Sequence, residues 1–220
     1  WATSYHGDFL QRCLADPAHT AGSFAVYGRG GTAPEHWLSG GLDSIPTIQR
    51  DNASTQRNLG ADDKVPLCKK RLKPMLDAHR PRRLLAFFGD NLQSESPAAV
   101  TRQFERLVAA IAASGVGPTG CFIMTPTYEM ETAKRRSVAA KTLVNTLKVR
   151  DAARAAVGTR CRFLDGLALM DASPYKSGTP EEPRLRRVAV AGTSGCVGAS
   201  ANDNVHVCGE AARDLAGRVC

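Results

Sequence analysis

The chain has 220 residues, of which 43% are hydrophobic and 23% are charged, and its formal net charge is +8 at pH 7. These values suit one globular domain spanning residues 1–220 and exclude a disordered or fibrous chain. No apolar run approaches the roughly 18 residues of a membrane-spanning helix, so we expect no such span.

The first half of the chain predicts alternating helices and strands. FLQRCLAD (Phe9–Asp16) indicates a short helix, and the apolar run SFAVYG (Ser23–Gly28) indicates a strand. Ser39–Pro66 is rich in Gly, Asp, Asn and Ser, which is typical of a loop. A helix is expected over Leu72–His79, followed by the clearest strand, RLLAFFGDN (Arg83–Asn91).

The middle of the chain continues the alternation. TRQFERLVAAIAASG (Thr101–Gly115) predicts a helix because its large apolar residues recur on one face and a glycine ends the run. Those apolar residues are Phe104, Leu107, Val108 and Ile111. GCFIMTPT (Gly120–Thr127) predicts a strand, Glu131–Val157 a basic helix, and TRCRFLDG (Thr159–Gly166) another strand.

The last part of the chain adds a loop over Asp171–Pro183, a strand at RRVAVAGTS (Arg186–Ser194) and a closing helix at EAARDLAGRV (Glu210–Val219). Strand–helix–strand alternation predicts an α/β domain whose central parallel sheet is covered by helices on both faces. In such sheets, ligands bind at the carboxyl ends of the strands, so the functional residues are expected there.

Seven cysteines are spread over the chain, at positions 13, 68, 121, 161, 196, 208 and 220. No C-x-x-C occurs, which argues against a zinc ribbon or a thioredoxin-type site. The spacing places Cys121 near Cys161, and Cys196 near Cys208, if each pair lies on neighbouring elements. Two or three disulfides in an oxidising compartment are favoured over buried thiols in a reducing one, so we expect an extracytoplasmic protein.

The positive charge has two interpretations. Arginines and lysines can line solvated helix faces, as in AKRRSVAAK (Ala133–Lys141), or they can attract a polyanion. A basic helix over Ala133–Arg154 keeps nucleic acid open as a minor alternative. Because no aromatic residues interleave the basic clusters and no nucleic-acid motif occurs, we expect no nucleic-acid partner.

Five residues at strand ends or in loops combine into one kind of chemistry. A serine hydroxyl needs an adjacent base to act as a nucleophile. His206 can take the proton of Ser4, while Asp203 orients the imidazole. The backbone N–H of Ser4, the backbone N–H of Gly30 or Gly31, and the side-chain amide of Asn91 can stabilise an oxyanion. His206 and Cys208 are too few for a metal site, so we expect neither a metal nor a cofactor.

The ordered set Ser4, Gly30, Asn91 and Asp203-x-x-His206 resembles the SGNH hydrolase family, also called GDSL-type esterases. FFGDN resembles the strand-then-Gly-x-Asn block of that family, and DNVH resembles its terminal Asp-x-x-His block. MTPT and CRFLDG are similar to members that act on bacterial surface carbohydrates. The resemblance implies a three-layer α/β/α fold with a central parallel sheet and hydrolysis or transfer of acyl esters.

The chain departs from the family pattern at two places. Ala2-Thr3 stands where Gly-Asp usually precedes the serine, and Leu92 stands where an aspartate often follows the asparagine. GTS at the end of the late strand makes Ser194 a rival nucleophile, although its position after the Gly and Asn blocks breaks the family order.

These observations predict a serine esterase that removes acyl groups, above all O-acetyl groups, from a carbohydrate or a small ester. The first alternative is an O-acyltransferase domain, which receives acetyl from a membrane acyl donor protein and passes it to a polysaccharide. The second alternative is an inactive module that binds an anionic polysaccharide on the same scaffold.

Overall fold

The computed structural model describes residues 14–16, 18, 23–29, 31–41, 47–51, 56–59, 71–125, 136–172 and 209–219. The strands are β1 (Ala25–Gly28), β2 (Thr47–Asp51), β3 (Gln56–Leu59), β4 (Leu84–Phe87), β5 (Cys121–Met124) and β6 (Arg162–Leu164). The helices are α2 (Pro34–Leu38), α3 (Leu72–His79), the 3-10 helix η2 (Asp90–Leu92), α4 (Pro97–Ala113), α5 (Arg136–Val157), α6 (Gly166–Asp171) and α8 (Gly209–Val219).

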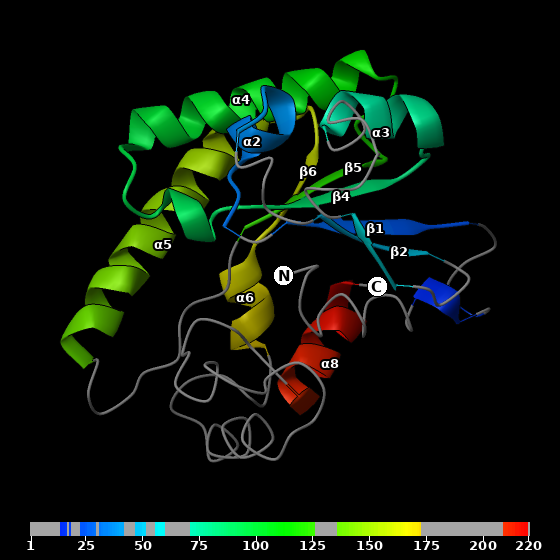
Figure 1. The fold of residues 1–220 in the computed structure, drawn as a ribbon. Helices are drawn as coiled ribbons and strands as arrows, with labels where there is room; N and C mark the ends of the chain where they lie inside the picture. The colour runs from blue at the N-terminus through cyan, green and yellow to red at the C-terminus, as the bar shows by residue number, and fades with distance from the viewer. Residues whose placement is uncertain are drawn as a thin grey trace.

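A three-stranded parallel sheet in the order β4-β5-β6 lies at the centre of the fold (Figure 1). Leu84 pairs with Cys121, and Phe122 pairs with Arg162. The connections between these strands run through α4 and α5, as parallel pairing requires. The predicted α/β class and the three strands expected at 83–91, 120–127 and 159–166 are therefore confirmed.

Helix α4 buries the apolar stripe that the sequence predicts. Phe104, Leu107, Val108 and Ile111 are all 0% exposed. The helix begins at Pro97, four residues before the predicted start at Thr101. The Ser96 side chain accepts a hydrogen bond from Ala99 N at 3.2 Å, and Pro97 occupies the first turn. This cap satisfies one of the unpaired N–H groups at the helix start.

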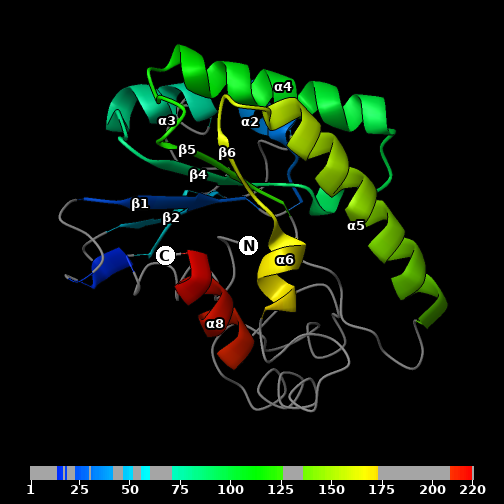
Figure 2. The ribbon, with the colours of Figure 1, turned by 180° about the vertical axis from the view of Figure 1, so that it is seen from behind.

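Helices lie on both sides of the parallel sheet (Figures 1 and 2). Helices α2, α3 and α4 are on one side, and α5 packs closely on α4 through a face of small apolar residues that includes Val149, Ala153 and Val157. On the other side, α8 lies beside α6, and Leu215 and Ala216 of α8 are 1% exposed. No helix in the described part of the chain is both long and apolar enough to cross a membrane.

The loop expected over Ser39–Pro66 is wrong in part, because it contains β2 and β3. These strands form an antiparallel sheet with β1, in the order β1-β2-β3, and Ala25 pairs with Asp51. Strand β1, which the alternation assigned to the parallel sheet, therefore belongs to a separate sheet. The segments TIQRD and QRNL carry few apolar residues, so main-chain pairing, and not an apolar run, defines them as strands.

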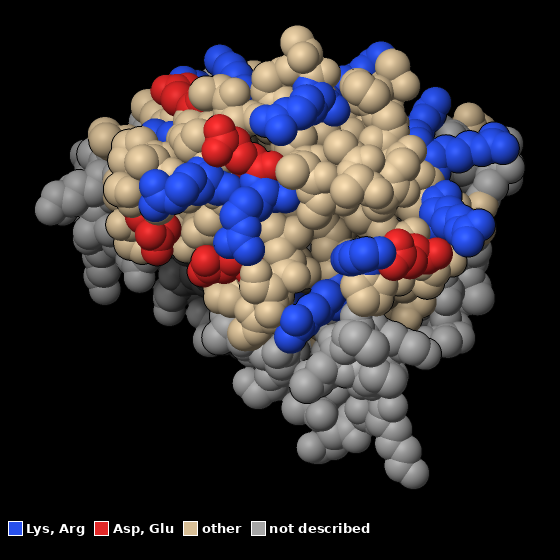
Figure 3. Space-filling model, turned by 90° about the horizontal axis from the view of Figure 1, so that it is seen from above, with Lys and Arg blue, Asp and Glu red and all other residues tan. Residues whose placement is uncertain are grey.

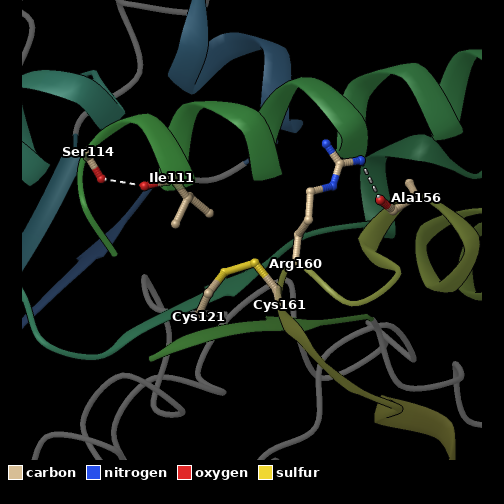
Figure 4. Close-up of a disulfide and its surroundings, with 6 residues drawn as sticks. All are labelled: Ile111, Ser114, Cys121, Ala156, Arg160 and Cys161. Atoms are coloured by element: carbon tan, nitrogen blue, oxygen red, sulfur yellow. Dashed lines mark hydrogen bonds between the residues drawn. A yellow bond between two sulfur atoms is a disulfide. The ribbon is translucent and has the colours of Figure 1, made fainter. Parts of the chain in front are cut away.

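A disulfide joins Cys121 at the start of β5 to Cys161 just before β6, with 4.7 Å between the Cα atoms (Figure 4). The predicted proximity of these two cysteines is confirmed. Both residues are buried, at 0% and 6% exposed. The bond ties the amino ends of two neighbouring strands that are 40 residues apart in the chain.

The remaining helix predictions agree with the structure where it describes them. Helix α3 matches Leu72–His79, α8 covers the closing helix, and α5 covers the basic helix from residue 136 onward. Most of the expected helix at Phe9–Asp16, the loop at Asp171–Pro183 and the strand at Arg186–Ser194 lie outside the described residues.

Candidate functional site

The turn that follows β1 is held by a chain of hydrogen bonds centred on Thr32. The hydroxyl of Thr32 donates to the carbonyl oxygen of Arg29 at 2.7 Å and accepts from the indole Nε1 of Trp37 at 2.9 Å. Gly31, which lies between Arg29 and Thr32 in the sequence, has a φ of 69°, a conformation that glycine adopts without steric cost. Thr32 and Trp37, which form the second of these bonds, are themselves buried.

Arg29 extends this network toward the antiparallel sheet. The residue is 5% exposed, and its guanidinium donates from Nε to Thr47 Oγ1 at 3.0 Å and lies 5.1 Å from the centre of the Trp37 ring. A buried charge is tolerated only where hydrogen bonds and ring contacts replace its water. Arg29 thus fastens the turn to both β2 and α2.

Asn91 is presented by the turn that follows β4. Gly89, with a φ of 142°, begins η2, and Leu92 N donates to Gly89 O at 2.9 Å. Leu92 is 1% exposed and anchors the turn in the core, whereas the side chain of Asn91 is exposed. The alternation of a buried anchor and an exposed amide is what a strand-end binding loop requires.

The structure brings the ends of β1 and β4 together at these two turns. The side-chain Nδ2 of Asn91 donates to the carbonyl oxygen of Thr32 at 3.2 Å, although the residues are 59 positions apart. Trp37 and Phe88 also meet edge to face, with 6.2 Å between ring centres. The amide nitrogen carries two N–H groups, and this bond uses one of them to orient the side chain.

Helix α5 supports the turn from behind. Lys148 Nζ donates to the carbonyl oxygen of Gln93 at 2.6 Å, and Gln93 Nε2 donates to Thr146 Oγ1 at 3.4 Å. These bonds fix the backbone two residues beyond Asn91. Helix α5 therefore holds the backbone of the turn that carries Asn91, while the bond to Thr32 O orients the amide itself.

Of the residues that the sequence predicts for the site, the structure describes Asn91, at the end of a parallel strand as expected. Ser4, Gly30, Asp203, His206 and the rival Ser194 lie outside the described residues. Within the described ranges, no group of three or more His, Cys, Asp or Glu side chains could hold a metal ion.

Sequence reasoning did not single out Arg29, Thr32 or Trp37. All three follow β1 within ten residues of the glycine turn, and the only signal for them was their place beside that turn. The chain matches no protein-family model, no curated protein and no solved structure.

Proposed function

We propose that the chain is a serine esterase with a fold of the SGNH hydrolase type. Ser4 attacks the carbonyl carbon of an ester, and His206 takes the hydroxyl proton while Asp203 orients the ring. The oxyanion that forms is stabilised by the backbone N–H at Gly30 and the side-chain amide of Asn91.

One observation supports this proposal above the others. The 3.2 Å hydrogen bond from Asn91 Nδ2 to Thr32 O joins the turn after β4 to the turn that contains Gly30. The two segments that would supply the oxyanion donors are distant in the chain, and a shared binding point is what the proposed chemistry needs. A strand-end asparagine with a purely local turn role would have no reason to contact the end of another strand.

The reaction proceeds in two steps. The Ser4 oxygen forms a bond to the acyl carbon, the ester C–O bond breaks, and His206 gives its proton to the leaving alcohol. Water, deprotonated by the same imidazole, then attacks the acyl-enzyme and releases the carboxylic acid. The substrate that we propose is an O-acetylated carbohydrate, on the resemblance of MTPT and CRFLDG to members that act on carbohydrates. We place it outside the cytoplasm because the Cys121–Cys161 disulfide suits an oxidising compartment.

The nucleophile can be identified directly. Wild type should hydrolyse p-nitrophenyl acetate and bind a fluorophosphonate probe covalently, and mass spectrometry of the labelled peptide should place the probe on Ser4. Ser4→Ala and His206→Ala should each lose roughly 10³-fold or more in kcat. A probe on Ser194 would overturn the assignment. If the protein shows no turnover and takes up no probe, the inactive binding module is favoured. If acetylated oligosaccharide forms in place of acetate, the protein is an acyltransferase.

The role of Asn91 gives a separate prediction. Asn91→Ala removes an oxyanion donor, so kcat on p-nitrophenyl acetate should fall about 10²–10³-fold. Asn91→Asp keeps the shape but replaces the N–H donor by a negative charge, so its loss should be at least as large. The side chain is exposed, but both variants lose its bond to Thr32 O. The thermal midpoint of each should therefore fall by no more than a few degrees, as expected for the loss of one hydrogen bond. Full activity in Asn91→Asp would rule out the donor role.

A further inference from the structure

A cluster of arginines lies at the end of the parallel sheet opposite to Asn91. Arg82 and Arg83 directly precede β4, and Arg162 is the first residue of β6. A pocket of about 410 Å³, which we call the arginine basin, is lined by Arg82, Arg83, Thr119, Gly120, Phe122 and Arg162. These residues surround the amino ends of the strands, whereas Asn91 follows the carboxyl end of β4. The proposed ester chemistry therefore uses none of them.

Among the described residues, nothing balances the positive charge of the basin. The lining residues that the structure describes include no carboxylate, and Arg82, Arg83 and Arg162 form no ion pair with any of the described residues. Three arginines elsewhere in the described residues do have acidic partners: Arg150 pairs with Asp151, Arg154 with Asp165, and Arg218 with Asp214. The face above α4 likewise shows acidic and basic side chains next to one another (Figure 3).

The floor of the basin is rigid. Gly120 O accepts a hydrogen bond from Leu84 N at 2.8 Å, and a Cβ at Gly120 would lie 2.2 Å from Arg82 O, so no larger residue fits there. The disulfide from Cys121 to Cys161 fixes the adjoining strand ends (Figure 4). A preformed floor reduces the entropy that is lost when a ligand is bound.

We propose that the arginine basin binds an acidic polysaccharide through its carboxylate or sulfate groups. The guanidinium group presents a planar fork of donors that matches such oxyanions and remains charged at any physiological pH. Binding at this site goes beyond the proposed esterase activity and does not depend on it.

The lining of the basin favours a polysaccharide over the two other polyanions. The Arg162 guanidinium lies 5.7 Å from the centre of the Phe122 ring. It covers one face of the aromatic ring found among the described lining residues, which makes that ring a poor stacking platform for an unpaired base. The one large hydrophobic residue found strongly exposed within the described residues is Val144, on α5 and outside the basin lining. The lining therefore offers no apolar group that could insert into a membrane surface.

Two double variants test the site, because each removes two positive charges. Arg82→Gln/Arg83→Gln changes the basin, and Arg102→Gln/Arg106→Gln changes the exposed face of α4. Heparin and polygalacturonate serve as sulfated and carboxylated probes, with calorimetry as the measurement. The basin variant should bind both roughly tenfold more weakly or worse, and the α4 variant should stay within about threefold of wild type, where non-specific charge effects lie.

Two further measurements separate the competing explanations. Thermal midpoints within a few degrees of wild type in both variants would show that folding is intact, and Ser4→Ala should bind heparin as wild type does, because binding is independent of ester chemistry. Equal losses in the two double variants would mean that only net charge matters and would overturn the proposal. So would tighter basin-dependent binding of duplex DNA, RNA or phosphatidylserine vesicles than of either polysaccharide.

Discussion

At the scale of single residues, Thr32 makes three hydrogen bonds next to the candidate site. Its hydroxyl both donates and accepts, to Arg29 O and from Trp37 Nε1, and its carbonyl oxygen accepts from Asn91. Since Thr32 is 7% exposed, water cannot easily replace a lost bond. The residue therefore couples the stability of the β1 turn to the orientation of Asn91.

Thr125, at the carboxyl end of β5, provides the matched contrast. It is 0% exposed, yet its Oγ1 has no hydrogen-bond partner among the residues that the structure describes. Replacing a hydroxyl by a methyl group removes hydrogen bonds from Thr32 but removes only an unsatisfied polar atom from Thr125. The same chemical change should therefore have opposite effects at the two positions.

We predict that Thr32→Val lowers the free energy of unfolding by about 1–3 kcal/mol, because the buried indole N–H of Trp37 loses its acceptor. Thr125→Val should leave the free energy of unfolding unchanged or raise it by up to about 1 kcal/mol. Urea unfolding followed by Trp fluorescence and circular dichroism measures both. A destabilised Thr125→Val would reveal a partner for this hydroxyl, and a neutral Thr32→Val would contradict the central role of Thr32.

At the scale of elements, α4 is the central helix of the group α2, α3, α4 and α5. It lies against α2, α3 and α5, and Phe104 is among its largest fully buried side chains. We predict that Phe104→Ala lowers the free energy of unfolding by about 3–5 kcal/mol, through lost transfer energy and the cavity left behind. Ala109→Gly, on the exposed side of the same helix, should cost only about 1 kcal/mol.

Denaturant titration of the two α4 variants separates packing from helix propensity. The Phe104→Ala midpoint should shift much further than that of Ala109→Gly with little change in slope. Equal shifts would mean that α4 contributes through its own helicity and not through the core that it covers.

The elements that could be predicted are those whose pattern is local. Phe104 and its apolar neighbours recur at helical spacing, so the helix containing them could be read from the chain alone. β2 could not, because its segment TIQRD has no strong alternation and is defined by pairing with β1 and β3. For the same reason SFAVYG was wrongly assigned to the parallel sheet: nothing in this segment distinguishes a parallel from an antiparallel partner.

The candidate site shows the same limit. The position of Asn91 after a strand could be predicted, since FFGDN is a local signal. Its hydrogen bond to Thr32 could not, because that contact joins residues 59 positions apart. The roles of Arg29 and Trp37 likewise depend on their burial. Burial cannot be predicted from the sequence of a polar, glycine-rich turn.

At the scale of the whole molecule, the Cys121–Cys161 disulfide connects folding to compartment. It closes a loop of 40 residues that contains α5 and joins β5 to β6, the two strands whose amino ends form part of the arginine basin. In an oxidising compartment the bond limits the conformations of the unfolded chain. In a reducing one, the same two buried thiols would keep their packing but lose that constraint.

This difference can be measured, because a 40-residue loop corresponds to about 3–4 kcal/mol of stabilisation in the chain-entropy account. We predict that dithiothreitol lowers the wild-type free energy of unfolding by about that amount. The double variant Cys121→Ala/Cys161→Ala should have a lower free energy of unfolding without reductant, and dithiothreitol should lower it less than in wild type. The difference between the two responses measures the contribution of the Cys121–Cys161 bond. Equal responses in both proteins would assign the effect to other cysteines. If the wild type is insensitive to the reductant, the fold does not require an oxidising compartment, and the argument for an extracytoplasmic carbohydrate substrate loses its structural support.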